Sequence, residues 1–152
     1  MEKKFLVTTA HKDTWKSEES LLFLGKWCLL YNDKINWEKL NYDVANYHWD
    51  DREKFHNDYR GSITLMDKFI PILSASLNKI HGVDKSEKYW RIIIAPWLGY
   101  FIQIMLDRWF MVNYAYSSYN ISDTIILDVD PKEMIPYDVR EFGNLITSDI
   151  WN

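Results

Sequence analysis

Residues 89–109 constrain the fold more than any other part of the chain. The stretch reads YWRIIIAPWLGYFIQIMLDRW, and Gln103 is the only strongly polar side chain between Arg91 and Asp107. A membrane span needs about 20 apolar residues, whereas runs of roughly 10–14 are more often core helices. We therefore expect a central apolar helix near residues 87–113, buried in the protein, and no transmembrane span.

Composition and charge narrow the class of protein. The 152 residues carry a net charge of −4, with a pI near 5.5, and contain no run of Lys or Arg that could follow a phosphate backbone. Nucleic acid is therefore not an expected partner. Cys28 is the only cysteine, which excludes an intrachain disulfide and a cysteine-based zinc site. We expect a cytoplasmic protein, with peripheral association with the inner face of the cytoplasmic membrane left open.

Short apolar runs predict four strands, at residues 4–9, 21–25, 43–47 and 124–129. An Asp-x-x-Glu pattern predicts three helix starts, because the Asp can accept from a free amide of the first turn while the Glu reaches back. The three pairs are Asp50/Glu53, Asp84/Glu87 and Asp138/Glu141. After the first, apolar residues at helical spacing predict a helix from Ser62 to His81, kinked at Pro71.

The order of these elements predicts an α/β fold. We expect a three-layer, Rossmann-like domain over residues 1–152, with a short, mainly parallel sheet and the apolar helix packed across it. Neither GxGxxG nor GxxxxGK[ST] occurs in the chain, which argues against a dinucleotide-binding or P-loop enzyme. No protein-bound cofactor is expected.

Ligands of open parallel sheets collect outside the carboxyl ends of the strands. In residues 48–52, HWDDR, the predicted third strand is followed by an imidazole, an indole, two carboxylates and a guanidinium at a helix start that favours anions. His48 could act as a general acid or base, and Arg52 could hold a phosphate or carboxylate. The same residues could instead cap the helix and close a turn, so both interpretations stay open.

Two further polar pairs have alternative interpretations. Asp128 and Asp130 would share one face of an extended strand and could hold a divalent metal, although a turn before Pro131 explains them equally well. In the apolar helix, Gln103 and Asp107 form one stripe, which is either an internal hydrogen-bond network or the floor of a pocket.

The strings FLVTTA, FLGKWC, YHWDDR, YWRIIIAPWLGYFIQIMLDRW and SDIWN together resemble the N-terminal region of a transferase family encoded in bacterial O-antigen and surface-polysaccharide gene clusters. The resemblance covers essentially the whole chain. Members of that family are longer, which implies that this chain is the N-terminal lobe of a longer transferase and lacks a C-terminal lobe.

The resemblance implies transfer of a sugar from a nucleotide-activated donor, in a two-lobed enzyme similar to the GT-B glycosyltransferases. Its substrate would be a carbohydrate or a nucleotide sugar. His48 and Asp51 are the candidate catalytic residues. The candidate substrate-binding residues are Thr8, Thr9, Trp27, Trp49, Arg52, Arg91, Gln103, Asp107 and Arg108.

Two other functions remain open. A single-lobed GT-A arrangement would use Asp128 and Asp130 to bind Mg²⁺ or Mn²⁺. A non-catalytic interaction domain would dock a protein partner or a membrane interface through exposed tryptophans.

Overall fold

The computed structural model describes residues 2–16, 18–149 and 151. Two residues of the string SDIWN, Ile150 and Asn152, lie outside the described residues. The chain forms two compact units. The first comprises the residues up to Tyr47 together with those from Met111 onward, and the second is His48–Phe110. Each is described by itself.

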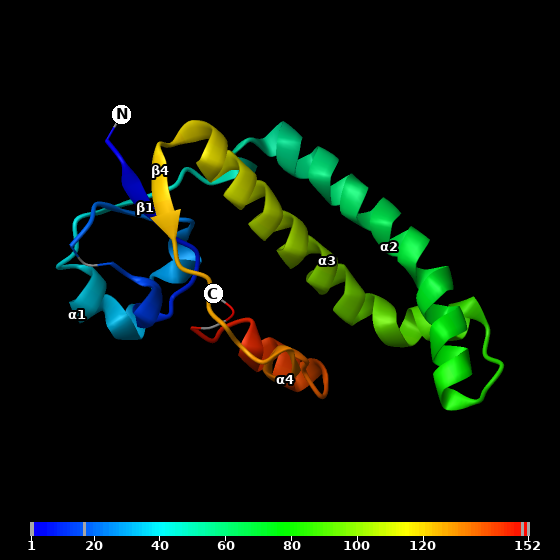
Figure 1. Ribbon diagram of the computed structural model, residues 1–152. Helices are drawn as coiled ribbons and strands as arrows, with labels where there is room; N and C mark the ends of the chain where they lie inside the picture. The colour runs from blue at the N-terminus through cyan, green and yellow to red at the C-terminus, as the bar shows by residue number, and fades with distance from the viewer. Residues whose placement is uncertain (1, 17, 150, 152) are drawn as a thin grey trace. The chain divides into compact units, whose positions relative to one another are not determined.

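The first unit is built on a parallel sheet of four short strands in the order β3-β2-β1-β4. The strands are β1 (Lys4–Val7), β2 (Leu21–Phe23), β3 (Tyr42–Val44) and β4 (Ile121–Thr124). Figure 1 shows β4 beside β1. Short 3-10 helices and two short α-helices complete the unit: η1 (Lys12–Thr14), η2 (Lys26–Cys28), η3 (Tyr31–Asp33), α1 (Lys34–Trp37), η5 (Pro131–Met134) and α4 (Val139–Leu145).

The core of the first unit lies on the two central strands. Phe5, Leu6 and Val7 of β1 are at most 1% exposed, as are all three residues of β2. Because successive residues of a strand point to opposite faces, both faces of the sheet are covered. Met111 and Ala115 belong to the same buried cluster. The short runs of apolar residues in the sequence therefore form fully buried parallel strands.

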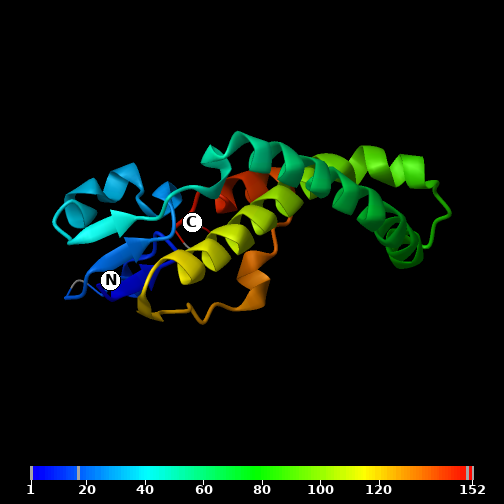
Figure 2. The same ribbon diagram turned by 90° about the horizontal axis from the view of Figure 1, so that it is seen from above.

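The second unit is a helical hairpin of α2 (Arg52–His81) and α3 (Glu87–Ser118), preceded by η4 (His48–Asp50). Figure 2 shows the two long helices side by side, joined by a short loop. The loop begins at Gly82, whose φ of +62° is the left-handed conformation that ends many helices. Ile70, Leu98 and Ile102 form the buried centre of the hairpin. The last residues of α3, from Met111 on, belong to the first unit.

The predicted α/β class, the parallel sheet and the long helices, including one long apolar helix, are confirmed. The fourth strand was predicted too late, at residues 124–129, because the pattern of apolar residues does not show where the partner strand ends. Thr124 pairs with Leu6, one residue before β1 stops at Val7, so the chain after Thr124 has almost no ladder left to join.

Two of the three predicted helix caps are wrong. At α2 the capping side chain is Asp51, not Asp50, and the helix is continuous from Arg52 instead of beginning at Ser62. At α3 the amide of Tyr89 donates to the hydroxyl of Ser86. Ser86, which is nearer to the helix, therefore accepts the bond that was predicted for Asp84. The third cap is confirmed, because Asp138 accepts from the amide of Glu141 at 2.8 Å.

The expectation that the apolar helix is buried is wrong for most of its length. By length and composition α3 could cross a membrane, yet only 17% of its most apolar window is buried. Its contacts explain this, because one side packs on α2 and only the last turns, at Met111, Val112 and Ala115, join the sheet core.

Candidate functional site

An open hollow lies where the strand order of the sheet reverses. The chain places β2 and β3 on one side of β1 and β4 on the other, so β1 and β4 flank the topological switch point. In open parallel sheets this is the position at which ligands bind, beyond the carboxyl ends of the strands. The hollow has residues that follow both strands in its lining: Thr8, Thr9, Ile125, Ile126, Leu127, Val129, Pro131 and Met134.

The two threonines of this hollow differ in what their hydroxyls can do. Thr9 Oγ1 lies 3.2 Å from Thr14 Oγ1 and accepts from the amide of His11 at 3.3 Å, so it holds the turn after β1. Within the described part of the chain, no group bonds the Thr8 hydroxyl. The hollow therefore offers mainly apolar walls with one hydroxyl that a ligand could use.

The predicted metal pair does not have its predicted geometry. Asp128 and Asp130 follow the end of β4 and lie on no strand, so the argument that they share one strand face is wrong. Asp130 instead accepts from the amide of Lys132 at 2.9 Å and caps η5. Among residues 2–16, 18–149 and 151, no three His, Cys, Asp or Glu side chains gather as metal ligands would.

A buried polar cluster occupies the second unit where η4 meets α2 and α3. We call it the His48 cluster; its members are His48, Trp49, Lys54, Asp58, Asp107 and Arg108. His48 Nε2 donates to Asp107 Oδ1 at 3.0 Å, and the other ring nitrogen lies 4.0 Å from Asp58 Oδ2. Asp107 also accepts from Arg108 Nη1 at 2.7 Å. One imidazole thus lies between two carboxylates.

The second carboxylate of the cluster is held in its charged form. Asp58 accepts from the indole of Trp49 at 2.9 Å and from the ammonium of Lys54. Burial by itself would raise the pKa of Asp58, but the hydrogen bonds from Lys54 and Trp49 and the charges of Lys54 and His48 outweigh it, so the pKa lies below its usual value. The Lys54 ammonium also lies 4.1 Å from the centre of the Phe110 ring.

The His48 cluster connects two elements that are far apart in the sequence. The His48 side chain is 3% exposed and that of Asp107 is 9% exposed. The partners of so enclosed an imidazole lie inside the protein. Its bond to Asp107 connects η4, at the start of the second unit, with α3. Of the predicted substrate-binding residues, the structure brings Trp49, Asp107 and Arg108 together around His48.

Asp51 and Arg52 lie beside this cluster but point to a different role. The Asp51 carboxylate accepts from the amides of Glu53 and Lys54, each at 3.0 Å, and so satisfies two amides that the helix itself leaves free. Arg52 is the exposed first residue of α2. The run HWDDR therefore supplies a helix cap, although the capping side chain is Asp51 and not the predicted Asp50.

Substitutions at Asp51 separate capping from catalysis. Asp51→Ala should lower the free energy of unfolding by about 1 kcal/mol, because Ala cannot accept from the two amides, whereas Asp51→Asn should change it little. Urea denaturation of both variants measures this. Turnover should follow stability, with Asp51→Asn fully active. An inactive Asp51→Asn protein of unchanged stability would instead assign a catalytic role to the carboxylate.

Of the remaining predicted residues, Gln103 lies beside the His48 cluster, because it lines a small void between α2 and α3 together with Trp49 and Asp58. Arg91 is bound by Asp67 at 2.8 Å and by Glu87 at 3.8 Å, the latter being the partner that its spacing predicted. Trp27, in the first unit, packs edge-to-face against Tyr47 with ring centres 6.5 Å apart.

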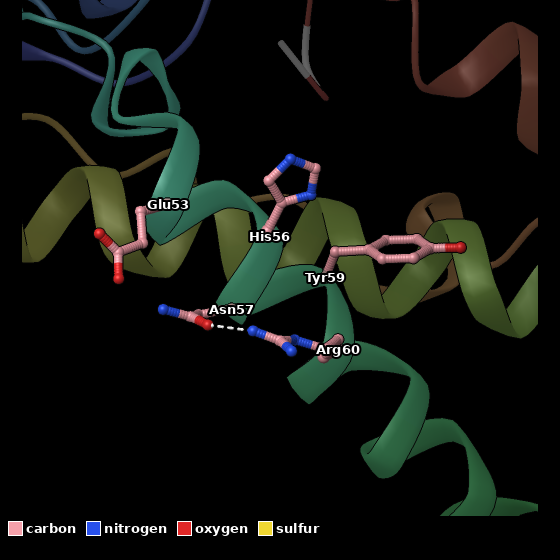
Figure 3. A pocket seen from close by; sticks show the side chains of 5 residues that line it. All are labelled: Glu53, His56, Asn57, Tyr59 and Arg60. Atoms are coloured by element: carbon pink, nitrogen blue, oxygen red, sulfur yellow. Dashed lines mark hydrogen bonds between the residues drawn. The ribbon is translucent and has the colours of Figure 1, made fainter.

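A second open hollow lies on the exposed side of α2 (Figure 3). Its lining residues are Glu53, His56, Asn57, Tyr59 and Arg60. All five come from the same helix, and the contact drawn in Figure 3 joins Arg60 Nη2 to Asn57 Oδ1 at 2.6 Å. A single helix surface provides no enclosing wall, so this hollow is a weaker candidate than the one at the switch point.

Two members of the His48 cluster, Lys54 and Asp58, were not among the residues predicted from the sequence. Their spacing of four residues in a helix was a usable signal, because such a pair meets on one helix face. The contacts of Asp58 with Trp49 and His48 had no comparable signal, since they depend on how η4 folds back onto α2.

The family of the protein follows from its similarity to known proteins. No curated protein and no solved structure matches the chain significantly. Over residues 4–152 the chain matches the family described as LIC12162 family transferase. Because the match includes the switch-point hollow, the His48 cluster and nearly every residue between the two ends, the protein belongs to this family of transferases.

Proposed function

We propose that the chain is part of a glycosyltransferase that takes a sugar from a nucleotide-activated donor, in the synthesis of a bacterial surface carbohydrate such as O-antigen. Membership in a transferase family supports the group-transfer part. The resemblance in the sequence to families of surface-polysaccharide gene clusters supports the sugar. The one structural observation that carries the proposal is the hollow at the switch point of the sheet.

The hollow fits the nucleoside part of such a donor. Its walls are aliphatic side chains, including Ile125 and Val129, which can cover a base or a ribose face. The Thr8 hydroxyl gives one directional contact. Dinucleotide-binding folds with this strand order bind their ligand at the same place relative to the strands. Such a likeness supports the place of binding and leaves the identity of the donor to experiment.

The proposal assigns neither His48 nor Asp51 to the chemical step. Each already has structural partners, Asp107 for the imidazole and two backbone amides for the carboxylate. The residues that bind the acceptor and the catalytic base would come from elsewhere in the complete protein. A C-terminal lobe that faces the hollow, as in two-lobed glycosyltransferases, would supply them.

Thr8→Val tests the hollow in the complete protein. Valine keeps the shape of threonine and removes the hydroxyl, so Kd for the donor should rise about 2- to 10-fold, equivalent to one lost hydrogen bond. Donor binding is measured by calorimetry against a panel of UDP-, GDP-, dTDP- and CMP-sugars. Thr64→Val, on the exposed side of α2, is the matched control and should bind as wild type.

The outcomes distinguish an error in the position of the donor site from an error in the proposed glycosyltransferase function. If wild type binds a nucleotide sugar and Thr8→Val binds it equally well, Thr8 is not a donor contact and the hollow loses its main support. If the complete protein binds none of the panel and transfers no sugar, the proposed function is wrong.

A further inference from the structure

The first third of α3 carries an apolar surface that nothing in its own unit covers. We call it the α3 outer face; its members are Tyr89, Ile92, Ile93, Pro96 and Tyr100. Ile92 is 69% exposed, Ile93 51% and Tyr100 66%. At 100° per residue all five lie within one stripe about 100° wide. Contiguous exposed apolar stripes of this kind mark interaction surfaces.

This face is separate from the packing of the hairpin. The opposite side of α3 makes the contacts with α2, and there Trp90, Leu98 and Ile102 are buried. The α3 outer face therefore points away from α2. Isoleucines and tyrosines form this face, since Trp90 is 7% exposed; the exposed tryptophan of the hairpin, Trp109 at 65%, lies further along α3 and outside the face.

The end of the hairpin that leads into this face is firmly held. The side-chain amide of Asn78 donates to the Lys85 carbonyl at 2.9 Å, and its oxygen accepts from the Lys85 amide at 3.0 Å. The same oxygen accepts from the Trp90 indole at 2.8 Å, and His81 stacks on that indole. The loop thus presents Val83, Tyr89 and their neighbours in a defined arrangement.

The charge of the hairpin end, residues 79–93, indicates what kind of partner the α3 outer face could bind. Residues 79–93 hold four basic side chains, Lys79, Lys85, Lys88 and Arg91, against Asp84 and Glu87, a balance of +2 in a chain whose net charge is −4. The rest of the chain therefore carries −6. Arg91 is bound by Asp67 and Glu87, which leaves three lysines and one aspartate at the hairpin end. Lys85 Nζ lies 5.6 Å from the centre of the Tyr89 ring.

We propose that the α3 outer face and the hairpin end bind the surface of an anionic membrane. Exposed isoleucines would enter the boundary between head groups and acyl chains, tyrosines would lie at the level of the head groups, and lysines would extend to the lipid phosphates. A second copy of the chain packed in parallel is a poorer occupant, since such a two-fold dimer would bring two positively charged hairpin ends together.

The geometry favours binding at the surface over crossing it. Met111 and Ala115, near the end of α3, are fully buried in the core of the first unit, and Asp107 is bonded to His48. These contacts hold the last half of the helix in protein. Only the first half, with the hairpin end, is available to lipid.

Vesicle flotation of the complete protein tests the proposal. Wild type should bind vesicles of phosphatidylcholine with about one third phosphatidylglycerol and bind much less to phosphatidylcholine alone. The double variant Ile92→Glu/Ile93→Glu should lose about tenfold or more in partitioning onto the anionic vesicles. Both positions are exposed, so the variant should fold. Ile35→Glu, at a residue of the first unit with 68% exposure, is the matched control and should bind as wild type.

A second variant separates charge from apolar contact. Lys79→Gln/Lys85→Gln/Lys88→Gln should weaken binding to anionic vesicles and should reduce its dependence on salt. Equal binding of wild type and Ile92→Glu/Ile93→Glu would overturn the proposal, as would no binding of wild type to either vesicle. If sedimentation shows wild type to self-associate and Ile92→Glu/Ile93→Glu does not, while neither binds vesicles, the face is a dimer interface and the proposal is wrong.

Discussion

Replacing Asp107 with Ala should lower the free energy of unfolding by about 3–5 kcal/mol. The Asp107 side chain is 9% exposed and accepts from His48 and Arg108. Its removal would leave an enclosed imidazole without its carboxylate and a partly buried guanidinium without one of its acceptors. Groups left without partners inside a protein lose their hydration and gain no compensating bond.

The measurement is urea denaturation of the protein, followed by tryptophan fluorescence, because Trp49 lies in the same cluster. Asp107→Asn is the second variant; it keeps an oxygen that His48 can use and should cost less than Asp107→Ala. Asp67→Ala is the matched control, since it breaks an exposed ion pair with Arg91 and should cost at most about 1 kcal/mol. A loss below about 1 kcal/mol in Asp107→Ala would show that the pair contributes little to the second unit.

The same variants bear on what the His48 cluster does. If the cluster only holds η4 against α3, turnover should fall in proportion to the fraction of protein that unfolds. A loss of turnover in Asp107→Asn at temperatures where the variant is fully folded would show that the His48 cluster contributes to turnover beyond its effect on stability.

The fold was largely predictable because its main signals are local. Runs of apolar residues predicted three of the four strands within a few residues, and the length of the apolar stretch predicted α3. What the sequence could not show was where strands end and which side chain caps a helix. β4 ends at Thr124, which pairs with Leu6, because β1 itself stops one residue later, at Val7.

The candidate sites were predictable only in part. The rule that ligands collect at strand ends pointed to Thr8 and Thr9, and a hollow does lie at these residues, because the rule depends on strand positions alone. The HWDDR string was less informative, since an Asp before a helix can cap it, act on a substrate or do neither. The contact of His48 with Asp107 spans 59 residues and depends on how two long helices pair.

The exposure of α3 is the main departure from expectation. Length and hydropathy describe what a helix could bury, whereas burial depends on how many elements are available to cover it. In the second unit α2 and the short η4 lie against α3, and they leave the outer side of its first turns uncovered. The apolar side that remains, at Ile92 and Ile93, is therefore a property of the hairpin.

Phe23→Ala should be the most damaging change in the sheet, with an expected loss of about 3–5 kcal/mol. Phe23 is fully buried on β2, and its ring meets those of Trp15 and Tyr42 edge-to-face, at 5.5 and 5.4 Å. Removal of the ring leaves a cavity in a core that has little room to collapse, and it also loses both aromatic contacts.

Phe23 also lies beside the strand that leads into the candidate site. It pairs with Val7 on one side and Val44 on the other, in the last row of the sheet before Thr8. Phe23→Ala should therefore weaken donor binding as well as stability, whereas Phe23→Leu keeps most of the volume and should cost less than about 1.5 kcal/mol. Thermal denaturation and donor titration of the two variants provide the comparison. Equal losses in both would mean that the aromatic contacts, and not the filled volume, hold this edge of the sheet; unchanged stability in Phe23→Ala would contradict the assigned core.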